Sequence, residues 1–196
     1  MTTRMRTAAA MFAVLLFASH AAAAKLSGTV TCKGARDNSD AVVYIDAIAG
    51  KTFQPPTAAV NVDQKQLAFV PHVVAVQAGT PVEFLNSDPF LHNVFSPDAC
   101  CDKFNLGSWP QGQKKSYTFK KECVATLLCN VHPEMEGFVV AVPTPYFAVT
   151  DKTGKWSIPD VPAGKYTLKV WHPKLKGTSK SVEVTADTTA DFEITR

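Results

Sequence analysis

The hydrophobic pattern of this chain indicates short β-strands along most of its length. In the stretch 58–142, segments of alternating apolar and polar residues have the period of a half-buried strand, and short apolar runs are typical of buried strands. Polar turns separate these segments, so the stretch predicts a β-sandwich or barrel. The strands that we expect here are 66–70, 73–76, 81–85, 92–95, 116–119, 124–128 and 137–142.

The two ends of the chain repeat this pattern in smaller pieces. Two strands are expected near the N-terminus, at 26–31 and 41–48, and further strands near the C-terminus, at 147–158 around a polar turn, 165–171, 181–184 and 190–194. Two strands are not stable alone in water, and a C-terminal piece of 54 residues is marginal for a core of its own. We therefore predict an all-β chain in which 25–57 and 143–196 form one sandwich, with 58–142 inserted between them.

The first 24 residues have the composition of a secretory signal peptide. Arg4 and Arg6 precede an apolar run that is too short to span a bilayer, and the alanines at 21–24 offer a cleavage site. No later segment is apolar enough for a membrane helix, so we expect no membrane association after cleavage. The formal net charge of +3 includes these two arginines. The mature chain is therefore nearly neutral, and nothing in its charge indicates nucleic-acid or anionic-lipid binding.

The segment Cys129-Asn-Val-His132-Pro-Glu-Met135 puts a thiolate, an imidazole and a thioether on one short loop. His92, at the start of an expected strand, offers a second imidazole. Two histidines, one cysteine and a distant methionine are the ligands of blue-copper electron-transfer sites. Each residue alone has a commoner role as core, disulfide or surface residue. Zinc also accepts His₂Cys but makes little use of a thioether. We predict one type 1 copper, held by His92, Cys129, His132 and Met135.

The remaining cysteines leave alternatives open. Five cysteines in an exported chain predict disulfides and at least one free thiol. Cys129 is the natural free one if it binds metal, and a bridge from Cys100 or Cys101 to Cys123 is expected. Spacing alone does not fix the pairing, and Cys32 has no assigned partner. If the extra thiols stayed reduced and bound Cu(I), the chain would serve copper delivery or storage, which is the alternative function.

Residues 66–142 resemble a cupredoxin. The resemblance rests on Phe69-Val-Pro71, the run 76–88, His92-Asn93-Val94 and the Cys-x₂-His-x₂-Met loop, which is similar to the short ligand loop of amicyanin. It implies that His92 and His132 bind through one ring nitrogen each, Cys129 as thiolate, and Met135 as the weak axial ligand. It also implies that Asn93 ties the two ligand loops together near the sulfur. The adjacent Cys100 and Cys101 depart from the pattern of simple cupredoxins.

The whole mature chain is similar to periplasmic plastocyanin-like proteins associated with methylamine utilisation. Those proteins combine a cupredoxin with a carboxypeptidase-regulatory-like (transthyretin-like) β-sandwich, and the run 150–168 carries that second resemblance. The resemblance implies a cupredoxin sandwich inserted in or beside a transthyretin-like sandwich. It also implies a periplasmic carrier of single electrons that docks transiently on redox proteins near His132. The docking patch that we expect consists of Phe90, Leu91, Pro133 and the Trp109-Pro110 pair.

We do not expect an enzyme. Copper oxidases and nitrite reductases need additional histidine-rich copper centres, and the chain has no His-x-His motif. The leftover His72 and His172 are more typical of a strand junction and a strand end than of a second metal site. An electron carrier is therefore preferred over copper handling and over catalysis.

Overall fold

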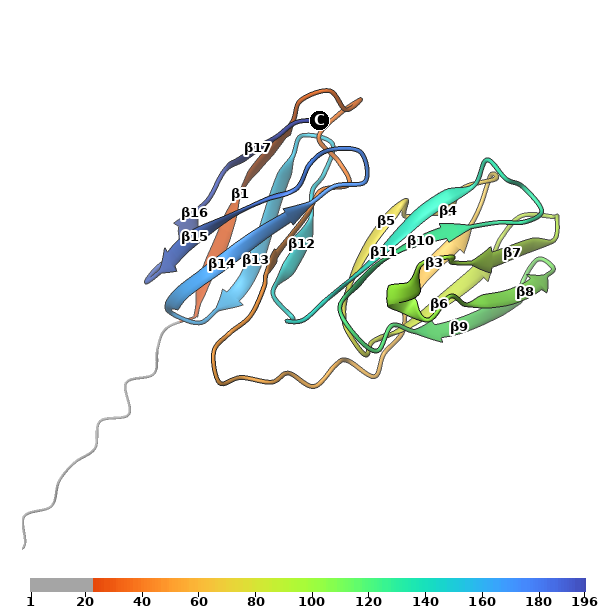
Figure 1. Cartoon of the computed structure of the whole chain (residues 1–196), viewed down its shortest axis with the longest axis horizontal. Coiled ribbons are helices and arrows are strands. Elements are labelled where there is room, and N and C mark those ends of the chain that lie inside the picture. Colours follow the sequence, from red (N-terminus) through yellow and green to blue (C-terminus); the bar gives the residue numbers. More distant parts are fainter. Residues whose placement is uncertain (1–22) are drawn as a thin grey trace, which may run out of the picture.

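The computed structural model describes residues 23–196, so the predicted signal peptide of residues 1–24 lies almost entirely outside the described residues. Within this range the chain forms strands β1 to β17 and one short 3₁₀ helix, η1, as Figure 1 shows. The predicted all-β class is confirmed. No helix in the described part is long and apolar enough to cross a membrane.

One sandwich is built from the middle of the chain. Its two sheets have the strand orders β5-β11-β10-β7-β8 and β4-β3-β6-β9. The side chains that alternate inward meet in one core, which includes Phe84, Phe119 and Leu127. The elements are β3 (Val60–Gln64), β4 (Phe69–Val70), β5 (Val73–Gln77), β6 (Pro81–Asn86), β7 (His92–Phe95), η1 (Ala99–Cys101), β8 (Asn105–Trp109), β9 (Lys114–Thr118), β10 (Cys123–Leu128) and β11 (Glu136–Val142).

The other sandwich is built from both ends of the chain. One sheet has the order β13-β1-β16, with β17 also on β1, and the second has the order β12-β2-β14-β15. The N-terminal strands pair with C-terminal ones, for example Leu26 with Ile158 and Val43 with Val170. The elements are β1 (Ala24–Cys32), β2 (Val42–Ile45), β12 (Phe147–Val149), β13 (Lys155–Val161), β14 (Gly164–Trp171), β15 (Thr178–Val184), β16 (Thr188–Thr189) and β17 (Phe192–Ile194).

The two sandwiches meet through a separate apolar cluster, which we call the interdomain face. It consists of Val42, Tyr44, Val73, Ala75, Phe138, Val140 and Val142, with Phe147 and Trp171 packed against it. The rings of Phe138 and Trp171 lie 5.5 Å apart. Every residue of β5 is buried because one side of the strand faces its own core and the other faces this cluster. Figure 1 shows β5 and β11 on the side of their sandwich that is turned toward β12.

Several details of the expected strands are wrong, and strand β3 (Val60–Gln64) was not expected. The segment 66–70 was expected to be one strand, but Gln66 and Leu67 have φ angles of 55° and 58° and form the two-residue turn of the β3–β4 hairpin. Successive positive φ angles match the twist of a tight hairpin, so the turn lets β3 pair with β4. Strand β8 was not expected, since Gly107 and two polar residues obscure its alternation, yet it pairs with β7.

Of the bridges left open by the cysteine spacing, the structure contains Cys100–Cys123. The bridge ties the η1 segment to the start of β10. Three cysteines in the described residues are free, namely Cys32, Cys101 and Cys129, and all three are buried.

Candidate metal centre

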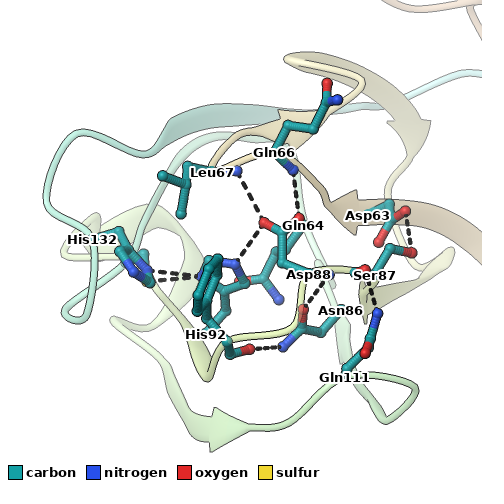
Figure 2. A network of polar contacts seen from close by, with 12 residues as sticks. Asp63, Gln64, Gln66, Leu67, Asn86, Ser87, Asp88, His92, Gln111 and His132 are labelled. Carbon is teal, nitrogen blue, oxygen red and sulfur yellow. Dashed lines mark hydrogen bonds and ion pairs between the residues drawn. The ribbon is translucent and has the colours of Figure 1, made fainter.

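Three side chains converge at one end of the middle sandwich. The Nδ1 atoms of His92 and His132 lie 3.1 Å apart, and the Sγ of Cys129 lies 4.0 Å from Nδ1 of His92. The three ligand atoms all lie within 4.8 Å of one another. His92 and Cys129 are buried, while His132 is partly exposed. Figure 2 shows the imidazoles of His92, at the start of β7, and His132, on the loop between β10 and β11, facing each other.

The antiparallel pairing of β7 and β10 brings these residues together. Leu128, the last residue of β10, is opposite Phe95 of β7, so Cys129 leaves its strand beside the start of β7. The backbone N–H of Asn93 donates to Sγ of Cys129 at 3.4 Å. This hydrogen bond holds the sulfur of Cys129 beside the start of β7, next to His92.

The side chain of Asn93 links three segments around the site. Its Oδ1 accepts the N–H of Asn130 at 3.3 Å, directly after Cys129. Its Nδ2 donates to Oδ1 of Asn105 and to the carbonyl of Gly107 on β8. The cysteine loop, β7 and β8 are therefore joined by one buried amide.

Met135 lies at the end of the same loop. Its backbone N–H donates to the carbonyl of His132 at 3.0 Å, which closes the loop into a turn. Its side chain is 1% exposed and belongs to the apolar core that also contains Cys129. The thioether is therefore enclosed on the core side of the loop, while the loop histidine reaches the surface side.

Asp88 orients His92, and sequence reasoning did not assign it this role. Its Oδ2 lies 2.9 Å from Nε2 of His92. The carboxylate also accepts the N–H groups of Gln66 and Leu67, at 2.6 and 2.9 Å, from the β3–β4 turn. Figure 2 shows these contacts converging on Asp88 from opposite sides. The signal in the sequence was an acid four residues before the ligand histidine.

The charge state of Asp88 follows from these contacts. Burial raises the pKa of this carboxyl, but the N–H groups of Leu67 and Gln66 and the neighbouring His92 imidazole outweigh burial, so the pKa is lowered overall. An ionised carboxylate accepts the Nε2–H of His92. The proton is then held on Nε2, and the Nδ1 lone pair faces Cys129 and His132.

Asn86 fixes the loop that carries Asp88. Its Oδ1 accepts the N–H of Asp88 at 2.9 Å, and its Nδ2 donates to the carbonyls of Phe90 and Trp109. The side chain is 2% exposed. The loop between β6 and β7 is therefore held at both of its ends before His92 begins its strand.

The other titratable candidates lie elsewhere. Within residues 23–196, His92, Cys129 and His132 form the one group of three or more converging metal-ligand residues. His72 and His172 line a different pocket together with Asp40. Cys32 belongs to the core of the other sandwich, and Cys101 donates its thiol hydrogen to Asp98 and Ser96.

Exposed apolar side chains lie near the partly exposed His132. Phe90 and Leu91 are each 53% exposed and Val131 is 44% exposed, and Pro133 is also exposed. The ring of Phe90 lies 6.1 Å from that of His132. We call Phe90, Leu91, Val131 and Pro133 the apolar rim. The expected membership of Trp109 is wrong, because this residue pairs with His92 across the β7–β8 ladder and its side chain is 1% exposed, inside the core.

A two-sheet sandwich with a buried His₂Cys group and an enclosed methionine at one end defines a cupredoxin domain. Residues 56–142 match the family described as copper binding proteins, plastocyanin/azurin family. Residues 144–192 match the family described as polysaccharide lyase family 4, domain II. The middle sandwich is therefore cupredoxin-like and carries a candidate copper site, and a second β domain accompanies it.

Solved structures give similarities of the same kind. Amicyanin from Paracoccus versutus (Thiobacillus versutus) is 26% identical, with 44% of this chain and 83% of that chain covered and a TM-score of 0.40. A purple cupredoxin from Nitrosopumilus maritimus is 23% identical, with 41% and 97% covered and a TM-score of 0.37. A copper-containing nitrite reductase from Thermus scotoductus is 24% identical, with 51% and 25% covered and a TM-score of 0.42. No curated protein sequence matches the chain.

These matches correct the expected family of the C-terminal sandwich. The C-terminal segment was expected to be carboxypeptidase-regulatory-like, but the family that it matches is the lyase domain named above. Polar turns such as 151–154 and 162–164 suit many small β-sandwiches, so such motifs select an architecture more than a family. Nothing in the matches connects the chain to methylamine utilisation.

Two of the three separations among the candidate ligand atoms are compatible with a single copper ion. At the bond lengths of zinc, about 2.0–2.1 Å to nitrogen and about 2.3 Å to sulfur, two nitrogens on one ion lie at most about 4.2 Å apart, and a nitrogen and a sulfur at most about 4.4 Å. The distances of 3.1 and 4.0 Å satisfy both limits. Soft sulfur ligands combined with imidazole are the donor set that copper prefers in electron-transfer sites.

Proposed function

We propose that this protein is a type 1 copper protein that carries single electrons between redox proteins of the periplasm. The observation that carries the proposal is the convergence of His92, Cys129 and His132 on one buried point of a β-sandwich. We assign the copper to these three residues, with Met135 as the weak axial ligand. Bound copper supplies one-electron chemistry by alternating between Cu(I) and Cu(II).

The protein's own contribution is to hold the ligands still. The ligand residues lie at strand ends, and Asn93 and Asp88 fix them through the hydrogen bonds described above. A carrier whose ligands do not rearrange between oxidation states needs little reorganisation for each transfer, and the surrounding bonds tune its potential. The plastocyanin/azurin match supports this role and favours a carrier over an enzyme.

His132 is the proposed exit for the electron. It combines a ligand nitrogen at the buried point with a partly exposed ring, and the apolar rim lies around it. Small apolar patches suit transient interfaces that form and separate quickly. The partner that we propose is a redox protein whose own cofactor edge is framed by apolar residues, so that the two edges approach without water between them.

Copper delivery or storage is not favoured. The chain has three free cysteines within its described part, a number that alone would suit copper handling. Cys32 and Cys101 are, however, buried in separate places and do not join the ligand group. Exchange of Cu(I) between proteins needs accessible thiolates, which neither residue offers.

The test is to load the mature protein with Cu(II) and record its visible and electron-spin-resonance spectra. An intense sulfur-to-copper charge-transfer band with narrow copper hyperfine splitting is expected for the wild type. Cys129→Ser should abolish the band. Cys101→Ser is the matched control, because it removes another buried free thiol of the same sandwich, and it should leave both spectra unchanged. A band that survives Cys129→Ser would refute the assignment.

A further inference from the structure

A polar contact lies at the boundary between the two sandwiches, next to the apolar interdomain face. Nδ1 of His72, in the junction between β4 and β5, lies 2.7 Å from Oδ2 of Asp40, which comes just before β2 of the other sandwich. Each side chain is about one-third exposed, at 36% and 30%. The pair therefore connects the two sandwiches beside the apolar interdomain face.

His72 is held from its own side. Its carbonyl accepts the N–H of Phe138 at 2.8 Å, and its ring packs edge-on against the ring of Phe138, with 5.5 Å between the centroids. Phe138 belongs to the interdomain face and also contacts Trp171. Because this packing already restricts the imidazole, the ion pair with Asp40 costs less side-chain entropy than a pair of free surface chains.

The charged groups around His72 come from several elements. Asp40 lies before β2, Glu136 begins β11, and Lys174 follows β14. A pocket of about 320 Å³ at this place is lined by the titratable and charged residues Arg36, Asp37, Asp40, His72, His172 and Lys174. The hydrogen bond to Asp40 raises the pKa of His72, burial and Lys174 act against it, and Glu136 adds to the increase.

The pKa of His172, the second histidine of the pocket, shifts in the opposite direction. It is 6% exposed, and its Nδ1 accepts the backbone N–H of Lys174 at 3.0 Å. Burial lowers the pKa of His172, so its imidazole stays neutral. His72 is therefore the member of this pair whose protonated form its surroundings favour.

We propose that His72 and Asp40 form a pH-dependent latch that closes the boundary between the two sandwiches. Protonated His72 makes an ion pair with Asp40, and neutral His72 leaves a weaker hydrogen bond. The free imidazole titrates near pH 6.5. Since the latched state raises the pKa of His72, its contribution is complete below about pH 6.5 and is lost as the pH rises through the raised pKa. The apolar interdomain face holds the sandwiches together at all pH values, so the latch changes how often they separate.

A thiol introduced by Ala75→Cys measures this separation. Ala75 lies in the interdomain face and is 8% exposed, so a sulfhydryl there reacts with a pyridyl disulfide only when the boundary opens. The full-length protein is labelled, with and without His72→Gln, and the labelling rate of each cysteine is measured separately on the peptide that contains it. Cys101, buried in the core of one sandwich, reports unfolding of that sandwich in the same sample.

At about pH 5.5, His72→Gln should speed labelling of the introduced thiol roughly two- to fivefold, the range of a partly exposed ion pair. At about pH 8.5 the ratio should fall toward one. Asp40→Asn should change the labelling rate by the same ratios as His72→Gln. The double variant should be labelled no faster than either single variant. A ratio that does not depend on pH would overturn the latch. So would a parallel change at Cys101, which would mean that the pair stabilises the whole fold instead of the boundary.

Discussion

Replacing Asp88 with asparagine removes an anion that contacts the proposed copper ligand His92. Three donors converge on this carboxylate, namely the N–H groups of Gln66 and Leu67 and Nε2–H of His92. An asparagine amide has one oxygen and one NH₂ group, so Asp88→Asn turns at least one donor toward another donor. Hydrogen bonds to charged groups contribute about 1.5–3 kcal/mol each. We expect Asp88→Asn to lower the free energy of unfolding by about 3 kcal/mol.

The same substitution should raise the reduction potential of the copper-loaded protein. A carboxylate on the far side of an imidazole lies roughly 7 Å from a bound ion, and with an effective dielectric constant near 20 its charge is worth about 2.4 kcal/mol. A tenfold change in a one-electron equilibrium, about 1.4 kcal/mol, corresponds to about 59 mV, so the upper limit is roughly 100 mV. The negative charge stabilises Cu(II), and its removal favours Cu(I).

Voltammetry of the loaded protein and thermal unfolding measure the two effects. Asp98→Asn is the matched control, because Asp98 accepts the partly buried N–H of Thr126 at 2.7 Å in the same sandwich, away from His92. It should lower stability and leave the potential unchanged. If Asp88→Asn retains copper but shifts the potential no more than Asp98→Asn does, the role of Asp88 in tuning His92 is refuted.

Three further predictions concern the rim, the boundary and a buried histidine. Leu91→Lys should slow electron self-exchange between two copies of the protein at least tenfold, as measured by NMR on mixed Cu(I) and Cu(II) protein, because the apolar rims of both copies must meet. The control Val124→Lys, at a residue that is 36% exposed, should not slow it. If the two variants exchange electrons at equal rates, the apolar rim is not the docking surface. Phe138→Ala should cost about 3 kcal/mol in chemical denaturation by opening a cavity in the interdomain face, and a cost below about 1 kcal/mol would contradict that packing. Burial lowers the pKa of His172, so its contribution to stability is present above about pH 6.5 and is lost as the pH falls. His172→Gln should therefore reduce the decrease in unfolding free energy on the acid side. If the dependence of the unfolding free energy on pH does not change, that decrease belongs to other groups.

The proposed ligand set was accessible to sequence reasoning because its chemistry is local. Cys129, His132 and Met135 are spaced on one loop, and only His92 had to be found at a distance, through its place at the start of an expected strand. The strand pattern predicted the all-β class for the same reason, since alternation is a local property.

The support around the site could not be found in this way. Asp88 acquires its role only because Gln66 and Leu67 adopt positive φ angles and turn their N–H groups toward it, and neither residue type signals such a turn. Trp109 was expected in the surface patch. Its burial depends on the pairing of β8 with β7, a strand whose own pattern is obscured by Gly107.

The doubly buried β5–β11 pair has a practical consequence for anyone who wishes to isolate the metal-binding half. A fragment cut at residues 58 and 142 would expose the apolar side chains of Val73, Phe138, Val140 and Val142 on the paired strands β5 and β11. Such a fragment should self-associate or precipitate unless these positions are made polar, so the shortest well-behaved form of this molecule retains both halves.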